Sequence, residues 1–112
     1  MSLTFKTSNP AALLRVFKKA IDDGHIVTWS YDSDGDFTHT PPQWNKKAWL
    51  RPEIQSGQLY LYIHGPTNAG VSREIYAIYH GRFIEVMLSH CDLLFSEGAA
   101  TALASNRDLV AA

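Results

Sequence analysis

Apolar residues near the N-terminus recur every three to four positions and so predict an amphipathic helix. Leu13 and Phe17 lie on this stripe, and most charged residues of the same stretch fall off it. The Ser-Asn-Pro sequence at 8–10 favours a helix start there, because a Ser or Asn side chain caps free N–H groups and proline suits the first turn. Gly24 is placed to end the helix. A short strand over 3–6 is expected before it.

In the middle of the chain, alternation replaces the helical period. Residues 58–64 alternate most clearly, with leucine and isoleucine pointing one way and Tyr60, Tyr62 and His64 pointing the other. Three further stretches are rich in β-branched and aromatic residues and are bounded by turn residues, as strands are. We therefore expect strands over 25–31, 47–54, 58–64 and 74–80.

Towards the C-terminus the apolar period returns to that of a helix. A stripe that includes Phe83 and Met87 predicts a second helix from about 82 to 95. The alanine-rich stretch 98–112 is expected to be a helical or flexible extension of a single domain that spans 1–97.

The predicted order, (β)αββββα, indicates an α+β domain with two layers. Strands joined by short turns favour an antiparallel meander of four to five strands, and the two amphipathic helices would cover one of its faces. The other face would carry Trp49, Arg51, Tyr60 and Tyr62, with Tyr31 and Tyr76 as neighbours.

Composition and charge narrow the classes of protein to which the chain can belong. Its 112 residues are enough for one domain, and 46% hydrophobic residues can build a core. Ten basic against eleven acidic residues give a net charge of −1, which disfavours nucleic-acid binding. Cys91 is the only cysteine, so the fold needs no disulfide. No apolar run has the length of a signal peptide or membrane span, so we expect a cytoplasmic protein without membrane contact and without a cofactor.

Three aspartates alternate within 32–36 and raise the question of a metal site. A calcium-binding EF-hand loop that began at the first aspartate would need glycine at its sixth position and glutamate at its twelfth. Phe37 and Gln43 occupy those positions, so the pattern fails. The pair Asp34-Gly35 is typical of a tight turn, and we expect a turn without a metal ion.

A carboxylate–imidazole site is the alternative for the same region. If the strands pair in sequential order, the candidates Asp34, Asp36, His39 and His64 fall on one rim of the sheet. A small hydrolase or lyase would need a carboxylate and an imidazole within about 3 Å of each other. We expect a non-enzymatic protein in which neither histidine converges on these aspartates.

The sequence His80-Gly81-Arg82 precedes the predicted second helix and is a candidate anion site. Free N–H groups and the helix dipole attract an anion at a helix start, and an arginine can bind it with two hydrogen bonds. A structural role is the alternative, because glycine lets a chain turn sharply between a strand and a helix.

The predicted aromatic face of the sheet carries the main functional hypothesis. Tyr, Trp and Arg are the residues that anchor interfaces, and a large exposed apolar face on a small protein marks an interface or a ligand groove. We expect an interaction module that forms a homodimer through this face. The alternative of a single-stranded nucleic-acid site with stacked bases lacks basic partners beyond Arg51 and residues 46–47.

Overall fold

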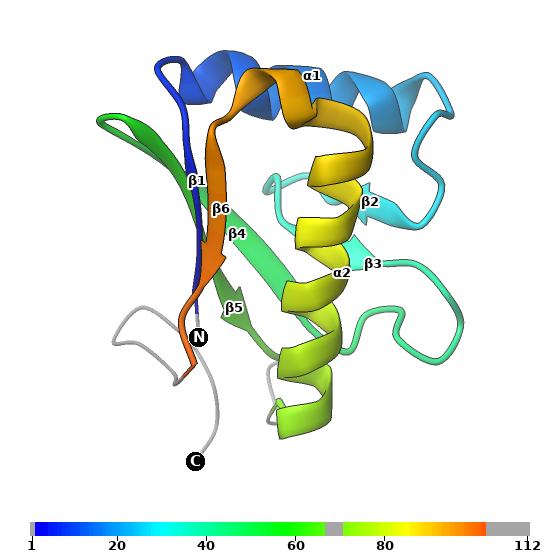
Figure 1. Cartoon of the computed structure of the whole chain (residues 1–112). Coiled ribbons are helices and arrows are strands. Elements are labelled where there is room, and N and C mark those ends of the chain that lie inside the picture. The colour runs from blue at the N-terminus through cyan, green and yellow to red at the C-terminus, as the bar shows by residue number, and fades with distance from the viewer. Residues whose placement is uncertain (1, 67–70, 103–112) are drawn as a thin grey trace.

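The computed structural model describes residues 2–66 and 71–102 of the chain. In chain order, its elements are β1 (Ser2–Lys6), α1 (Pro10–Asp22), β2 (Trp29–Tyr31), β3 (Phe37–His39), β4 (Trp49–Gln55), β5 (Gln58–His64), α2 (Arg73–Cys91), the short 3₁₀ helix η1 (Asp92–Leu94) and β6 (Glu97–Ala100). The strands form one antiparallel sheet in the order β2-β3-β4-β5-β1-β6, with α1 and α2 packed against it (Figure 1). The predicted α+β fold is confirmed, with six strands in the described part of the chain.

Helix α1 forms as its sequence predicts. The Asn9 side chain accepts a hydrogen bond from the backbone N–H of Ala12 at 3.1 Å, and a proline occupies the first turn. Leu13 and Phe17 are buried on one side of the helix. Gly24 follows the last turn with a φ of +80°, a left-handed conformation that favours glycine.

The hairpin of β4 and β5 is the centre of the sheet, and its alternation is as predicted. Gly57 turns the chain with a φ of +76°, and Gln55 pairs with Gln58 beside it. Along β5, side chains are alternately buried and half-buried: the aliphatic ones face the helices and the polar and aromatic ones face away from them. Both helices therefore cover one face of the sheet, and no helix of residues 2–66 and 71–102 covers the other, which we call the open face.

The expected strand over 74–80 is wrong, because these residues form the first half of α2. The helix begins earlier than predicted, where the Ser72 hydroxyl accepts a hydrogen bond from the N–H of Ile75 at 3.2 Å. Gly81 lies exposed inside the helix, where a Cβ atom would meet nothing within 4 Å, so this glycine does not end a strand. Tyr76 therefore lies on α2 and does not belong to the open face.

Two strands, β3 and β6, were not predicted. Residues 98–100 were expected in a helical or flexible extension, and they instead pair with β1 as part of β6. Gly98 allows this close approach, because a Cβ atom there would lie 2.9 Å from the Phe5 ring. The rest of the predicted extension, 103–112, lies outside the described residues.

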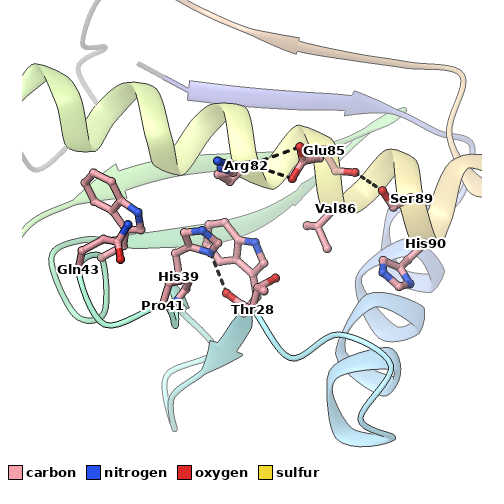
Figure 2. A pocket seen from close by; sticks show the side chains of 11 residues that line it. Thr28, His39, Pro41, Gln43, Arg82, Glu85, Val86, Ser89 and His90 are labelled. Atoms are coloured by element: carbon pink, nitrogen blue, oxygen red, sulfur yellow. Dashed lines mark hydrogen bonds and ion pairs between the residues drawn. The ribbon is translucent and has the colours of Figure 1, made fainter.

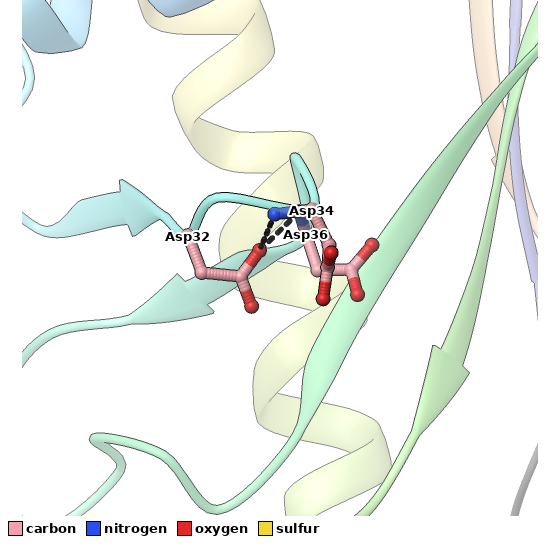
Figure 3. Close-up of side chains that lie close together, drawn as sticks. All are labelled: Asp32, Asp34 and Asp36. Carbon is pink, nitrogen blue, oxygen red and sulfur yellow. Dashed lines mark hydrogen bonds between the residues drawn. The ribbon is translucent and has the colours of Figure 1, made fainter.

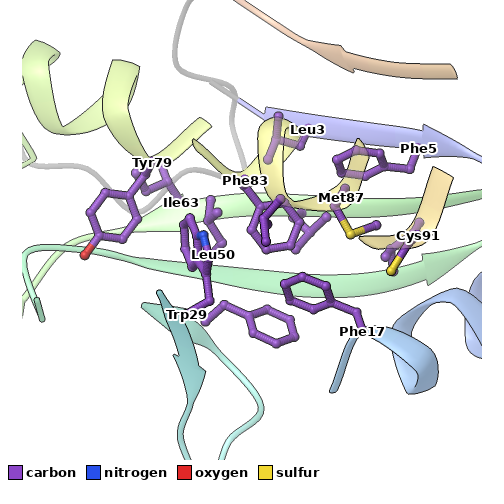
Figure 4. Packing of buried hydrophobic residues seen from close by; sticks show 14 of the residues in the cluster. Leu3, Phe5, Phe17, Trp29, Leu50, Ile63, Tyr79, Phe83, Met87 and Cys91 are labelled. Atoms are coloured by element: carbon purple, nitrogen blue, oxygen red, sulfur yellow. The ribbon is translucent and has the colours of Figure 1, made fainter. Parts of the chain in front are cut away.

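Aromatic rings fill the space between the helices and the sheet (Figure 4). Phe83, on the inner side of α2, is fully buried, and its ring centroid lies 5.1 Å from that of Phe17 and 5.1 Å from that of Trp29. Cys91 is buried in the same core, and burial raises the pKa of its thiol. Of the helices in the described part of the chain, none has both the length and the apolar character to span a bilayer.

Candidate functional site

The open face of the sheet carries five neighbouring side chains that we call the aromatic face: Trp49, Arg51, Tyr60, Tyr62 and His64. Register places them beside one another, because β4 and β5 pair Trp49 with His64 and Arg51 with Tyr62. The Trp49 and His64 rings stack at 5.7 Å with 17° between their planes. All five are half-buried, so each packs partly against its neighbours and still reaches solvent. Tyr31, an expected neighbour, instead donates a hydrogen bond to Asp22 of α1.

Asp36 links two side chains of the aromatic face, those of Arg51 and His64. Its side chain is 2% exposed and accepts two hydrogen bonds from Arg51, at 2.9 Å from Nε and 2.7 Å from Nη2. The second carboxylate oxygen also lies 3.1 Å from Nε2 of His64. One buried carboxylate thus orients both the guanidinium and the imidazole, an arrangement stronger than an exposed ion pair.

The surroundings of Asp36 keep it ionised. Burial alone raises the pKa of its carboxyl, but hydrogen bonds from Arg51 and His64, together with their charges, outweigh burial and hold the pKa below the ordinary value of 3.8. The hydrogen bond to Asp36 in turn raises the pKa of Arg51. A carboxylate stabilised in this way is a weak proton acceptor, and its chemical role is to position its two partners.

The expectation that neither histidine converges on the aspartates is wrong for His64, which contacts Asp36. It holds for His39, whose ring packs against Trp29 at 4.6 Å and whose Nδ1 lies 2.7 Å from the Thr28 carbonyl oxygen. The four candidate residues are therefore divided. Asp36 and His64 meet on the open face, and His39 lies on the side of the sheet that α2 covers.

The acidic loop is a hydrogen-bonded turn (Figure 3). An Asp32 carboxylate oxygen accepts the backbone N–H groups of Asp34 and Asp36, each at 3.0 Å, and Gly35 has a φ of +83°. The three carboxylates each place one oxygen within 4.8 Å of the others. Since Arg51 and His64 already bind Asp36, this turn has a sufficient structural role in presenting that residue to the sheet.

The predicted anion site at His80, Gly81 and Arg82 is wrong. These residues lie in the middle of α2, where backbone N–H groups are used within the helix, so no helix start faces a ligand. His80 is buried, and its Nδ1 lies 2.7 Å from the Tyr76 carbonyl oxygen one turn earlier. Arg82 is exposed and pairs with Glu85.

A cavity of about 380 Å³ on the helix side of the sheet is a second candidate site (Figure 2). It lies between the loop after β3 and one face of α2. His39 forms part of its wall, together with Trp44 from the loop and Arg82, Glu85 and His90 from the helix. The sequence contained a signal for this site, because the α2 lining positions 82, 85, 86, 89 and 90 recur at helical spacing. The loop residues gave no such signal.

We expect His39 to titrate at a lower pH than an ordinary histidine. Burial and the charge of Arg82 lower its pKa from 6.5 and outweigh the opposing effects of the Thr28 carbonyl and Glu85. The unfolded chain therefore binds this proton more readily, so the free energy of unfolding should fall as pH drops from about 6.5 through the lowered pKa. NMR titration of the ring and urea unfolding across this range would test it. His39→Gln should lack this contribution, and a ring that titrates at or above 6.5 would contradict the assignment.

Comparisons with protein-family models, curated protein sequences and solved structures found no match to this chain.

Proposed function

We propose that this protein is a binding module that associates with a second copy of itself through the aromatic face. The observation that carries the proposal is the pair of hydrogen bonds between Arg51 and the buried Asp36 carboxylate. These bonds hold the Arg51 guanidinium among the aromatic rings of the open face. Interfaces are enriched in these residue types, and a side chain that is already ordered loses less entropy on binding.

The aromatic face has further properties of an interface centre. Tyr60 and Tyr62 lie side by side, with ring centroids 6.0 Å apart, and two-χ aromatic side chains supply contact area at low entropic cost. Tyr62 lies directly across the β4–β5 pairing from Arg51, so the guanidinium has an aromatic neighbour as well as the Asp36 carboxylate. The face thus combines a rigid polar centre with apolar rings around it.

Charge on β4 supports a second copy of the chain as the partner. Arg51 and Glu53 project from the same face of this strand, on either side of Pro52. In a twofold dimer with its axis near Pro52, Arg51 of each copy would lie opposite Glu53 of the other. The net charge of −1 adds little repulsion between copies.

Tyr60→Glu is expected to convert the dimer to a monomer. A carboxylate at the centre of the buried face would be desolvated without a partner, which should raise the dimer dissociation constant roughly 30-fold or more, the effect of losing about 2 kcal/mol. Sedimentation velocity across micromolar concentrations would measure it.

Leu88→Glu is the matched control, because Leu88 is 54% exposed on α2, away from the open face. It should leave the dissociation constant unchanged. A parent protein that remains monomeric at 100 μM would overturn the proposal, and so would equal dissociation caused by both variants.

The Asp36–His64 contact supports a second candidate, an acid–base enzyme. A carboxylate that binds one ring nitrogen leaves the other able to take a proton, as in hydrolase triads. Binding is the better-supported proposal because Arg51 occupies both oxygens of the same carboxylate, and Trp49 stacks on the imidazole.

A further inference from the structure

The cavity beside α2 is separate from the aromatic face and is lined by charged and polar side chains of its own. One face of the helix supplies Arg82, Glu85 and His90, and the loop after β3 supplies Pro41 opposite them (Figure 2). Trp44 of the same loop also lines the cavity. Its volume of about 380 Å³ falls within the range of small-molecule pockets.

The loop wall of this cavity is held in place by buried hydroxyl groups. Tyr79, a fully buried residue of α2, donates its hydroxyl to the Trp44 carbonyl oxygen. The Thr38 hydroxyl lies 3.0 Å from that of Tyr79 and also accepts the backbone N–H of Lys46 at 3.1 Å. These contacts tie the loop to both the helix and the sheet, so the cavity is formed before any ligand arrives.

His39 gives the cavity wall a fixed hydrogen-bond acceptor. Its Nδ1 lies 2.7 Å from the Thr28 carbonyl oxygen, and a carbonyl only accepts, so Nδ1 carries the proton. In the neutral ring, Nε2 therefore keeps its lone pair. The residue is 5% exposed and packed against Trp29, which holds the ring in this orientation.

Arg82 and Glu85 place opposite charges at the same cavity. A single guanidinium nitrogen of Arg82 lies 3.3 and 3.4 Å from the two Glu85 oxygens, which are long contacts. The side chains are 52% and 65% exposed, and ion pairs of this kind contribute little stability. Arg82 and Glu85 can therefore give up their contact with each other, and each can pair with the oppositely charged group of a ligand that carries both an anion and a cation.

We propose that this cavity binds a small zwitterion of the aromatic α-amino-acid class. The carboxylate of the ligand would accept hydrogen bonds from Arg82, and its ammonium group would lie between Glu85 and Nε2 of His39. The aromatic side chain would contact Trp44, Pro41 and Val86, which supply the apolar part of the wall.

A metal ion fits this cavity less well. Within the described ranges, the set of three or more His, Cys, Asp and Glu groups close enough to share an ion is the aspartate turn on the other side of the sheet. His39, Glu85 and His90 do not form such a set, so an organic ligand is the better match to their spacing.

Titration calorimetry with three related probes tests the proposal. L-Tryptophan carries both charges, indole-3-propionate lacks the ammonium group and tryptamine lacks the carboxylate. We expect L-tryptophan to bind about 5- to 10-fold more tightly than either of the others, the effect of one charged hydrogen bond at a half-exposed site. Equal affinities for the three probes, or no binding of L-tryptophan at 10 mM, would overturn the proposal.

Two variants assign the charges. Arg82→Gln should weaken L-tryptophan and indole-3-propionate but not tryptamine, and Glu85→Gln should weaken L-tryptophan and tryptamine but not indole-3-propionate. Arg73→Gln is the control, because Arg73 is an exposed arginine in the first turn of the same helix. Shifts of the Trp44 indole N–H signal in NMR spectra would locate the ligand, and a shift pattern confined to other residues would contradict this site. Tyr60→Glu should bind as the parent does, which separates this test from that of the dimer.

Discussion

Phe83→Ala is expected to lower the free energy of unfolding by about 3–5 kcal/mol, the cost of removing a fully buried aromatic side chain and leaving a cavity. The ring is inaccessible to solvent and joins both helices to the sheet. Its aromatic neighbours are Phe5, Phe17, Trp29 and Phe37, at centroid distances of 5.9, 5.1, 5.1 and 5.8 Å. Urea unfolding followed by tryptophan fluorescence would measure the change.

Leu88→Ala is the control for this effect. Leu88 lies on the same helix but is 54% exposed, so its truncation should cost less than about 1 kcal/mol. Phe83→Leu, which keeps much of the volume, should fall between the two variants. Similar losses for Phe83→Ala and Leu88→Ala would show that α2 does not pack as described.

Asp36→Asn is expected to destabilise the protein by about 2–3 kcal/mol at neutral pH, because hydrogen bonds to a charged group are lost and Arg51 no longer has an anionic partner. The matched control is Asp34→Asn in the same turn, where the side chain is exposed and little change is expected. Losses of similar size in the two variants would show that the turn, and not the buried carboxylate, determines the effect.

The contribution of Asp36 should also depend on pH. Its folded pKa lies below 3.8, so the stabilisation is fully present above the unfolded pKa and is lost as pH falls through the lower folded value. The difference between the parent protein and Asp36→Asn should therefore be constant from about pH 5 upward and shrink below about pH 4. A difference that stays constant down to pH 2 would contradict the charge-based explanation.

The pattern of apolar residues predicted the correct element wherever a segment followed one clear period, helical or alternating. The cap and stripe of α1 and the alternation of β5 both act between residues that are close in sequence, so the sequence alone predicted them. The same alternation assigned Tyr60, Tyr62 and His64 to the open face. The β4–β5 hairpin then placed Trp49 and Arg51 beside them, as expected.

Residues 74–80 show where local propensity failed. Their β-branched and aromatic side chains favour a strand, but Tyr79 contributes to the buried stripe that continues through Phe83 and Met87. Burial of that stripe against the sheet decides the conformation, because packing outweighs the small intrinsic preferences. Strand β6 was missed for the opposite reason. Gly98 and its neighbours have low strand propensity, and they are extended because they pair with β1.

The meeting of Asp36 and His64 depended on a strand that was not predicted. Strands β3 and β5 run in the same direction, because each is antiparallel to β4. Asp36 precedes β3 and His64 ends β5, so strands paired over their full lengths would place the two residues at opposite ends of the sheet. An offset register brings them together: Phe37, at the start of β3, pairs with Leu50, near the start of β4, which places Asp36 next to Arg51. Register between short strands depends on contacts across the sheet.

The chain's own patterns were thus enough to predict its class, its two layers, helix α1 and the β4 and β5 residues of the open face, because these follow from the alternation of polar and apolar residues within single elements. They wrongly added Tyr76 and Tyr31 to that face. Tertiary structure alone decided the extent of α2, the existence of β3 and β6, the hydrogen bonds of Asp36 to Arg51 and His64, and the loop wall of the cavity beside His39. Each of these depends on side chains that are distant in sequence, and whether such groups meet is set by packing and strand register.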